Sequence, residues 1–163
     1  MKIYVSAVIL CLLAACGQPA ADTANLQSQI DSLKHKLDKS YRPGLGEFMS
    51  GIQVHHAKIW FAGTAGNWAL TGFEIGEIRE TIDDIQANCT DRPEIAFLPM
   101  IKPALDSLDA ATKNKSIPQF RSSFILLTNT CNNCHRATRH EFNVIQIPTS
   151  PPFNNQSFQK TAQ

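Results

Sequence analysis

The sequence predicts an all-α fold. Four segments between residues 45 and 140 carry apolar residues at alternating spacings of three and four, the period at which side chains return to one face of an α-helix. Short breaks rich in Gly, Pro, Asn and Asp separate these segments. No βαβ pattern occurs, and a chain of 163 residues suggests one domain. We therefore expect four amphipathic helices that each bury one apolar face.

The first predicted helix runs over Glu47–Ala62. Its spacing places Met49 and His56 on one interior face. His55 is rotated about 100° from that face, so we expect it at the edge of the helix or exposed. Asn67 follows a glycine-containing turn and is a candidate N-cap for the next helix. The complete apolar series is Leu45, Met49, Ile52, His56, Ile59 and Gly63.

The second predicted helix runs over Trp68–Asn88, and the third runs over about Glu94–Lys113. Pro99 and Pro103 fall inside the third segment, and each removes a backbone donor. We therefore expect a kink in this segment, or a helix that begins only near Met100.

The fourth predicted helix begins at Pro118 and ends at about His140. Ser116 and Gln119 have the spacing of a capping box at its start. Residues 141–163 differ in character, because several prolines there forbid a helix while apolar residues recur. We expect an extended tail that packs on the helices.

A Cys-x-x-Cys-His sequence lies on the last predicted helix and consists of Cys131, Cys134 and His135. This spacing is that of covalent c-type haem attachment. Residues three apart share one face of a helix, so both thiols can reach the two vinyl groups of one porphyrin. The adjacent histidine is then held at the iron as the proximal ligand.

Three other interpretations of the motif compete with haem. A thioredoxin-type redox pair belongs beside a βαβ pattern, which this chain lacks. A structural zinc site needs two further ligands, and Cys89, His140 and the His55/His56 pair form no matching second half-site. A plain disulfide is the third alternative. One covalent haem is favoured, because such attachment occurs outside the cytoplasm and the chain begins with an export signal.

That export signal occupies the first residues. Lys2 precedes the short apolar run Ile3–Leu13, which is too short to cross a membrane as a mature helix. Leu13-Ala14-Ala15-Cys16 then resembles the bacterial lipobox, in which the cysteine is lipidated and becomes the new N-terminus. We expect residues 1–15 to be a lipoprotein signal peptide and Cys16 to carry the lipid. The alternative is an ordinary secretory signal cleaved a few residues later.

The mature chain is expected to face the periplasm, anchored to a bacterial membrane by its lipid. Residue 17 is Gly rather than Asp, so the lipobox resemblance provides no inner-membrane retention signal, and the outer membrane is expected. Residues 16–44 would form a tether with a spacer helix, whose narrow apolar stripe is Leu26, Ile30, Leu33 and Leu37. Cys89 is left without a partner and is expected to be a buried thiol.

Composition and charge exclude several classes of protein. The formal net charge of +1 without a basic patch argues against nucleic acid as a partner. A hydrophobic content of 43% is enough for a core and too little for a protein with many membrane spans. No activated nucleophile, general base or phosphate loop is recognisable, so we expect neither an enzyme nor an organic substrate.

Four amphipathic helices with the haem motif near the end of the last one resemble the class II c-type cytochromes, namely cytochrome c-prime and its low-spin relatives. The resemblance covers 45–140 and implies an antiparallel four-helix bundle with one covalent haem. The short first helix and the long tail depart from the family. The stretches His56–Gly63 and Pro152–Phe158 are also similar to a group of uncharacterised bacterial haem-binding proteins. This second similarity implies no particular function.

The sixth iron ligand separates the functions that the resemblance implies. Low-spin relatives carry a methionine on the first helix, and Met49 occupies a similar place. His56, two turns further along, is the rival ligand. The leading hypothesis is one-electron transfer to a redox partner whose identity the sequence does not reveal. An empty sixth position would instead imply a protein that binds small gases such as nitric oxide. A structural lipoprotein stapled by zinc or a disulfide is the third hypothesis.

Overall fold

The computed structural model describes residues 20–160 and the side chains of residues 23–160. The described chain contains five α-helices and one 3-10 helix, with no β-strand, so the prediction of an all-α fold is confirmed. The predicted signal peptide, residues 1–15, and the predicted lipidation site Cys16 lie outside the described residues. The chain divides after Tyr41 into two units, which are described separately.

The first unit contains α2, Ala20–Asp38. This helix contains the predicted apolar stripe, beginning several residues before Leu26 and ending one residue after Leu37. Its last turn carries His35 and Lys36, cations that suit the negative end of the helix dipole. The apolar stripe predicted from the sequence is present on the helix but exposed to solvent, at Leu26, Ile30, Leu33 and Leu37.

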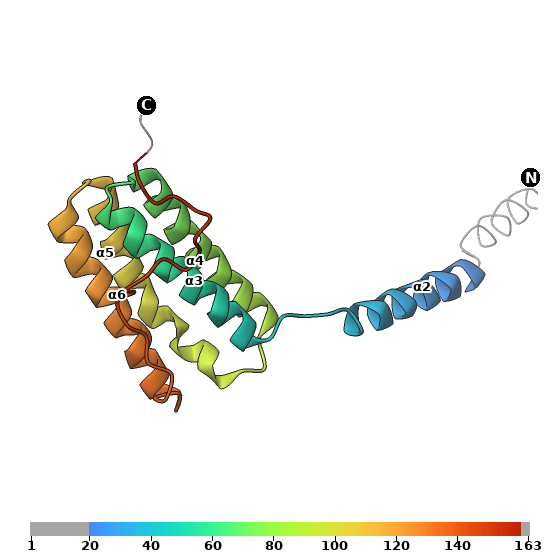
Figure 1. The fold of residues 1–163 in the computed structure, drawn as a ribbon. Helices are drawn as coiled ribbons and strands as arrows, with labels where there is room; N and C mark the ends of the chain where they lie inside the picture. The colour runs from blue at the N-terminus through green and yellow to red at the C-terminus, as the bar shows by residue number, and fades with distance from the viewer. Residues whose placement is uncertain (1–19, 161–163) are drawn as a thin grey trace, which may run out of the picture. The chain divides into compact units, whose positions relative to one another are not determined.

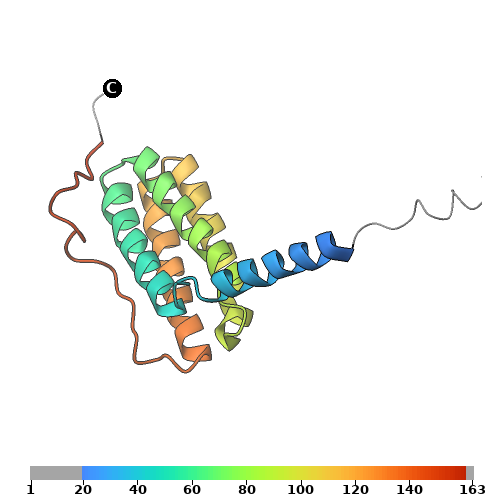
Figure 2. The same cartoon turned by 90° about the vertical axis from the view of Figure 1, so that its right-hand side faces the viewer.

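The second unit contains the remaining helices: α3 Leu45–Thr64, α4 Trp68–Asn88, the 3-10 helix η2 Pro93–Ile101, α5 Lys102–Lys113 and α6 Ile117–Ala137. Its four α-helices lie side by side in both views of the fold (Figures 1 and 2). Helix α3 packs on α4, α4 on α5, α5 on α6, and α6 on α3. The second helix has the bounds that its sequence predicted.

The turn between α3 and α4 is short, and a glycine and an asparagine define it. Gly66 has a φ of +71°, a left-handed conformation that glycine adopts without a steric penalty. The Asn67 side chain then accepts a hydrogen bond from the backbone N–H of Leu70 at 3.2 Å. Asn67 is therefore the N-cap that the sequence predicted, satisfying one of the free donors of the first turn.

The proline-containing third segment begins as a 3-10 helix, η2, and becomes α-helical only at Lys102. Pro99 lies inside η2, where it removes a backbone donor. Pro103 lies in the first turn of α5, where a missing N–H has no intrahelical partner to lose. The expected late start of the helix is therefore observed, two residues after Met100.

The core of the second unit lies between α3, α4, α5 and α6. Helix α3 approaches α6 closely at Gly63, where an added Cβ would lie 2.1 Å from Cζ of the buried Phe120 ring. Cys89 is buried and carries a free thiol, as predicted. The side chains that are essentially inaccessible are Ile59, Thr71, Glu74, Ile75, Ile78, Ile85, Leu105, Leu108, Phe120, Phe124 and Leu127.

Helix α6 ends at Ala137, about one turn earlier than predicted. Arg139 has a φ of +62°, which takes the chain out of the helix. The tail that follows has no regular secondary structure through residue 160. Phe158 is buried and its ring centroid lies 5.8 Å from that of Phe61, whereas Phe142 is 81% exposed. The expected packing of the tail therefore holds at its far end and fails at Phe142.

Candidate functional site

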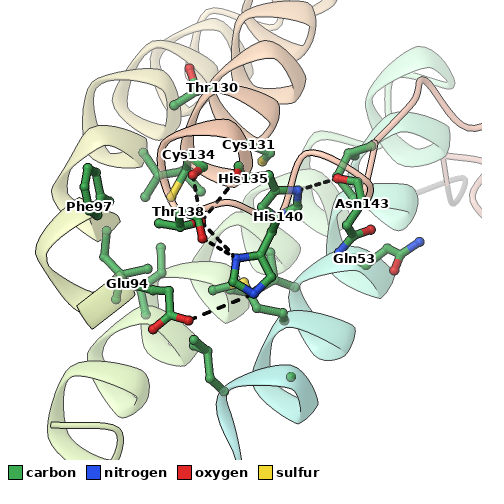
Figure 3. A pocket seen from close by; sticks show the side chains of 18 of the residues that line it. Gln53, Glu94, Phe97, Thr130, Cys131, Cys134, His135, Thr138, His140 and Asn143 are labelled. Carbon is green, nitrogen blue, oxygen red and sulfur yellow. Dashed lines mark hydrogen bonds and ion pairs between the residues drawn. The ribbon is translucent and has the colours of Figure 1, made fainter. Parts of the chain in front are cut away.

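A cavity of about 300 Å³ lies between the first half of α3, the end of α6, η2 and the beginning of the tail (Figure 3). Cys131, Cys134 and His135 contribute to its wall from α6. Met49 and His56 contribute from α3. The structure thus brings all five residues that the sequence nominated for haem into one cavity. Its apolar lining residues are Leu45, Ile52, Ile82, Phe97, Leu98, Ile101 and Ile145.

The imidazole of His135 is held by the tail. Its Nδ1 lies 2.6 Å from the backbone carbonyl oxygen of Asn143, and Figure 3 draws this hydrogen bond. A carbonyl oxygen can only accept, so Nδ1 carries the hydrogen and donates it. In the neutral ring Nε2 then has a free lone pair. Histidines that bind metals characteristically donate their other N–H to a carbonyl or carboxylate in this way.

Asn132, which lies between the two cysteines, binds the tail at Ile145, two residues after Asn143. Its side-chain Nδ2 donates to the carbonyl of Ile145 at 2.9 Å, and the N–H of Ile145 donates to its Oδ1 at 2.8 Å. The amide side chain therefore pairs with one residue of tail backbone through both of its polar atoms. Ile147 packs against the hydrophobic core just beyond this point. Sequence reasoning assigned no role to Asn132, because nothing in the motif spacing indicates a partner thirteen residues away.

The two cysteines are half-buried and carry free thiols. Burial, and to a smaller extent the neighbouring Cys134, raises the pKa of Cys131 to about 11. Burial also raises the pKa of Cys134 above its usual value. Both groups are therefore neutral thiols at pH 7. Within residues 23–160, no group of three or more His, Cys, Asp or Glu side chains is arranged to hold a metal ion.

His56 is a buried histidine whose Nε2 is already hydrogen-bonded. The Thr128 hydroxyl donates to the carbonyl of Phe124 at 2.9 Å, so it accepts the bond from His56 Nε2–H, also at 2.9 Å. The imidazole packs on the Phe124 ring with centroids 4.4 Å apart, and only 3% of the residue is exposed. Burial lowers the pKa of His56 to about 4, so the ring is neutral at pH 7.

Met49 differs from His56 in its surroundings. It is partly buried, packs against the core and lines the cavity from the first turns of α3. A thioether is a weak acceptor that needs no hydrogen-bond partner when buried, and it is a soft ligand for iron. Of the two candidate sixth ligands, Met49 is therefore the one with no polar atom committed to a hydrogen bond.

Charged residues that sequence reasoning missed lie on the η2 side of the cavity. Arg92 Nη2 donates to Glu94 Oε1 at 2.9 Å, and His140 Nε2 lies 4.0 Å from the same oxygen (Figure 3). The hydrogen bond from Arg92 lowers the pKa of Glu94 below its usual value. Arg92 and Glu94 flank a predicted helix break, where apolar periodicity carries no information about side-chain direction.

His55 was expected at the helix edge or exposed, and it is partly buried, with a partner that the sequence did not predict. Its Nδ1 lies 2.6 Å from Oε2 of Glu74, whose other oxygen lies 3.2 Å from the Lys58 ammonium. Only 1% of the Glu74 side chain is exposed. Glu74 falls three residues after Thr71 and four before Ile78, which is the one sequence signal that it shares their buried face. This ion-pair cluster lies outside the cavity.

No protein-family model, curated protein or solved structure matches this chain. Among the helices that the structure describes, none is long and apolar enough to cross a membrane.

Proposed function

We propose that this protein is a membrane-tethered monohaem c-type cytochrome that transfers single electrons in the periplasm. The observation that carries the proposal is the state of His135. Its Nδ1–H is donated to the carbonyl of Asn143, and its Nε2 is left as a free ligand beside two neutral thiols that share the cavity.

The helical arrangement proposed for the second unit is an antiparallel four-helix bundle over 45–140. Contacts between α3 and α6 support opposite directions for this pair, because Gly63 meets Phe120 whereas His56 meets Thr128. Short connections after α3 and after α5 also favour antiparallel neighbours. In such a bundle the end of α6 lies beside the start of α3, where the cavity is found.

The donor set fits a covalent haem. Each thiol, of Cys131 and Cys134, would add across one vinyl group, its sulfur bonding to one carbon and its hydrogen passing to the other. His135 would be the proximal ligand through Nε2. Met49 would be the sixth ligand, because it lines the cavity without a hydrogen bond, whereas His56 is held against Phe124 and Thr128 and could offer only its Nδ1. When bound, the haem supplies reversible Fe(III)/Fe(II) cycling, and a methionine ligand raises the potential of that couple.

The remaining parts of the proposal concern partners and location. A lipid on Cys16 would anchor the chain to a bacterial membrane, with the outer membrane expected, and the electron donor and acceptor would be other redox proteins. We propose neither an enzymatic reaction nor an organic substrate. The apolar lining of the cavity, with its few polar groups, suits a porphyrin plane that is partly covered.

The test begins with the purified mature protein and a haem stain on a denaturing gel. A stained band supports covalent attachment. An unstained band refutes it and favours the interpretation of the motif as a zinc site or a disulfide. Oxidised and reduced visible spectra then report the ligands. A sharp α band on reduction supports six-coordinate iron, whereas high-spin spectra in both states would exclude Met49 and His56 as ligands and favour gas binding.

Met49→Ala tests whether Met49 is the sixth ligand, and Met100→Ala is the matched control. Met100 is an exposed methionine of η2 that does not line the cavity. We expect Met49→Ala to convert the spectrum towards high spin and to lower the midpoint potential, with Met100→Ala unchanged. An unaltered spectrum in Met49→Ala would refute its assignment as the sixth ligand.

A further inference from the structure

We propose that Asn132 is a positioning residue that tunes the iron site through the tail. By pairing with the backbone of Ile145 it keeps the carbonyl of Asn143 at Nδ1 of His135. This inference rests on the proposed function and goes beyond it, because it assigns to the tail a role in setting the redox potential. The tail segment involved is residues 138–145.

The first support is that this segment is held at both ends. At its start the chain leaves α6 through the left-handed Arg139, and the N–H of His140 donates to the carbonyl of His135 at 2.7 Å. The N–H of Asn143 then donates to the carbonyl of His140 at 2.9 Å. At its end the two hydrogen bonds of Asn132 hold Ile145. The carbonyl of Asn143 lies between these two attachments.

The second support is that apolar burial does not hold the residues next to Asn143. Phe142 and Val144 are exposed, so apolar burial does not position the residues on either side of Asn143. Ile147 and Phe158 do pack on the helices, but they lie beyond Ile145. Removing the Asn132 amide should therefore release the Asn143 carbonyl while the distal tail stays docked.

The consequence for the iron follows from the basicity of the ligand. A carbonyl that accepts the Nδ1–H bond makes the imidazole a stronger electron donor through Nε2. Stronger donation stabilises Fe(III) relative to Fe(II) and lowers the midpoint potential. Loss of the Asn143 carbonyl from His135 should therefore raise the potential, whichever group occupies the sixth position.

Asn133 provides a matched control within the same motif. It is exposed, and its Oδ1 accepts a hydrogen bond from Arg136 one turn away on the same helix. It makes no described hydrogen bond to the tail. Asn132→Ala and Asn133→Ala thus remove the same amide from neighbouring positions, and only the first disconnects Ile145.

The experiment measures the midpoint potentials of the haem-loaded wild-type, Asn132→Ala and Asn133→Ala proteins. We expect Asn132→Ala to shift the Fe(III)/Fe(II) equilibrium about tenfold towards Fe(II), an upward shift of ~59 mV for one electron. Asn133→Ala should match the wild type. Hydrogen exchange at the amide of Ile145 should accelerate in Asn132→Ala alone. Equal potentials in the two variants would overturn the inference, even where the exchange rate changes.

Ile145→Pro removes the N–H that donates to Asn132 and leaves the haem motif unchanged. This variant tests the inference even if Asn132→Ala does not bind haem. We expect it to raise the potential as well, and an unchanged potential would overturn the inference. A wild-type protein without haem refutes the proposed function and this inference together. A haem-loaded wild type whose potential is insensitive to Asn132→Ala and Ile145→Pro refutes the inference alone.

Discussion

Gly63→Ala tests the packing between α3 and α6 on which the position of the cavity depends. A Cβ at this position would lie 2.1, 2.3 and 2.6 Å from the Cζ, Cε2 and Cε1 atoms of Phe120. The ring cannot move aside freely, because it is fully buried and neighbours the rings of Trp60, Trp68 and Phe124. The helices must therefore separate or the ring must leave its preferred rotamer.

The magnitude follows from two opposing effects. Overpacking a well-packed core costs about 1–3 kcal/mol. Replacing Gly by Ala within a helix gains up to about 1 kcal/mol, and less at Gly63 because it lies next to the last residue of α3. We expect a net destabilisation of about 0.5–2.5 kcal/mol. Gly51→Ala in the same helix is the control, since its Cβ would meet nothing within 4 Å, and it should stabilise the fold by about 0.5–1 kcal/mol.

The assay is urea unfolding followed by far-UV circular dichroism, on the haem-free and haem-loaded proteins. The free energies of unfolding of the two variants should differ by about 1–3.5 kcal/mol, with Gly63→Ala the less stable. Phe120→Leu should restore part of the loss in the Gly63→Ala background, because the smaller side chain vacates space beside the new methyl group. A Gly63→Ala protein as stable as Gly51→Ala would refute the close approach of α3 to α6.

Two further predictions concern buried ionisable groups. In the haem-free protein, His56 has a pKa of about 4 when folded against 6.5 ordinarily, so the unfolded chain binds more protons between these values. The free energy of unfolding should therefore fall by about 3 kcal/mol as the pH drops from 6.5 to 4. Urea titrations at several pH values measure this dependence, which should be weaker in His56→Gln. Glu74→Ala should cost at least about 2 kcal/mol, because it removes the buried partner of the Lys58 ammonium and of the His55 ring. Asp106→Ala, which breaks only the surface pair with Arg79, should cost less than about 1 kcal/mol, and similar losses for the two variants would contradict the burial argument.

Helix positions were largely predictable, since the signals are local. The bounds of α4 follow from an N-cap and an apolar period that lie within the segment itself. The 3-10 start of the third segment follows from its prolines, which act on their own backbone. The end of α6 was predicted one turn too late, because apolar period and charge do not reveal that Arg139 adopts a left-handed conformation.

The residues of the candidate site were predictable from the sequence, whereas the hydrogen-bond partners of its histidines were not. A helix carries Cys131, Cys134 and His135 on neighbouring positions, and a bundle with α3 beside α6 brings Met49 and His56 to them. By contrast, the partner of His55 is nineteen residues away on another helix. Pairings of that kind depend on how faces of separate helices meet, which no window of sequence contains.

By itself, the sequence determined the helical class, the core faces and the haem motif, because hydrophobic period, caps and motif spacing act within a few residues of each other. Only the tertiary structure decided that Thr128 occupies Nε2 of His56 and that the Asn143 carbonyl occupies Nδ1 of His135. Both hydrogen bonds join residues that lie apart in the sequence, and each engages one specific nitrogen of an imidazole ring. The proposed choice between Met49 and His56 and the proposed tuning of His135 therefore depend on the fold.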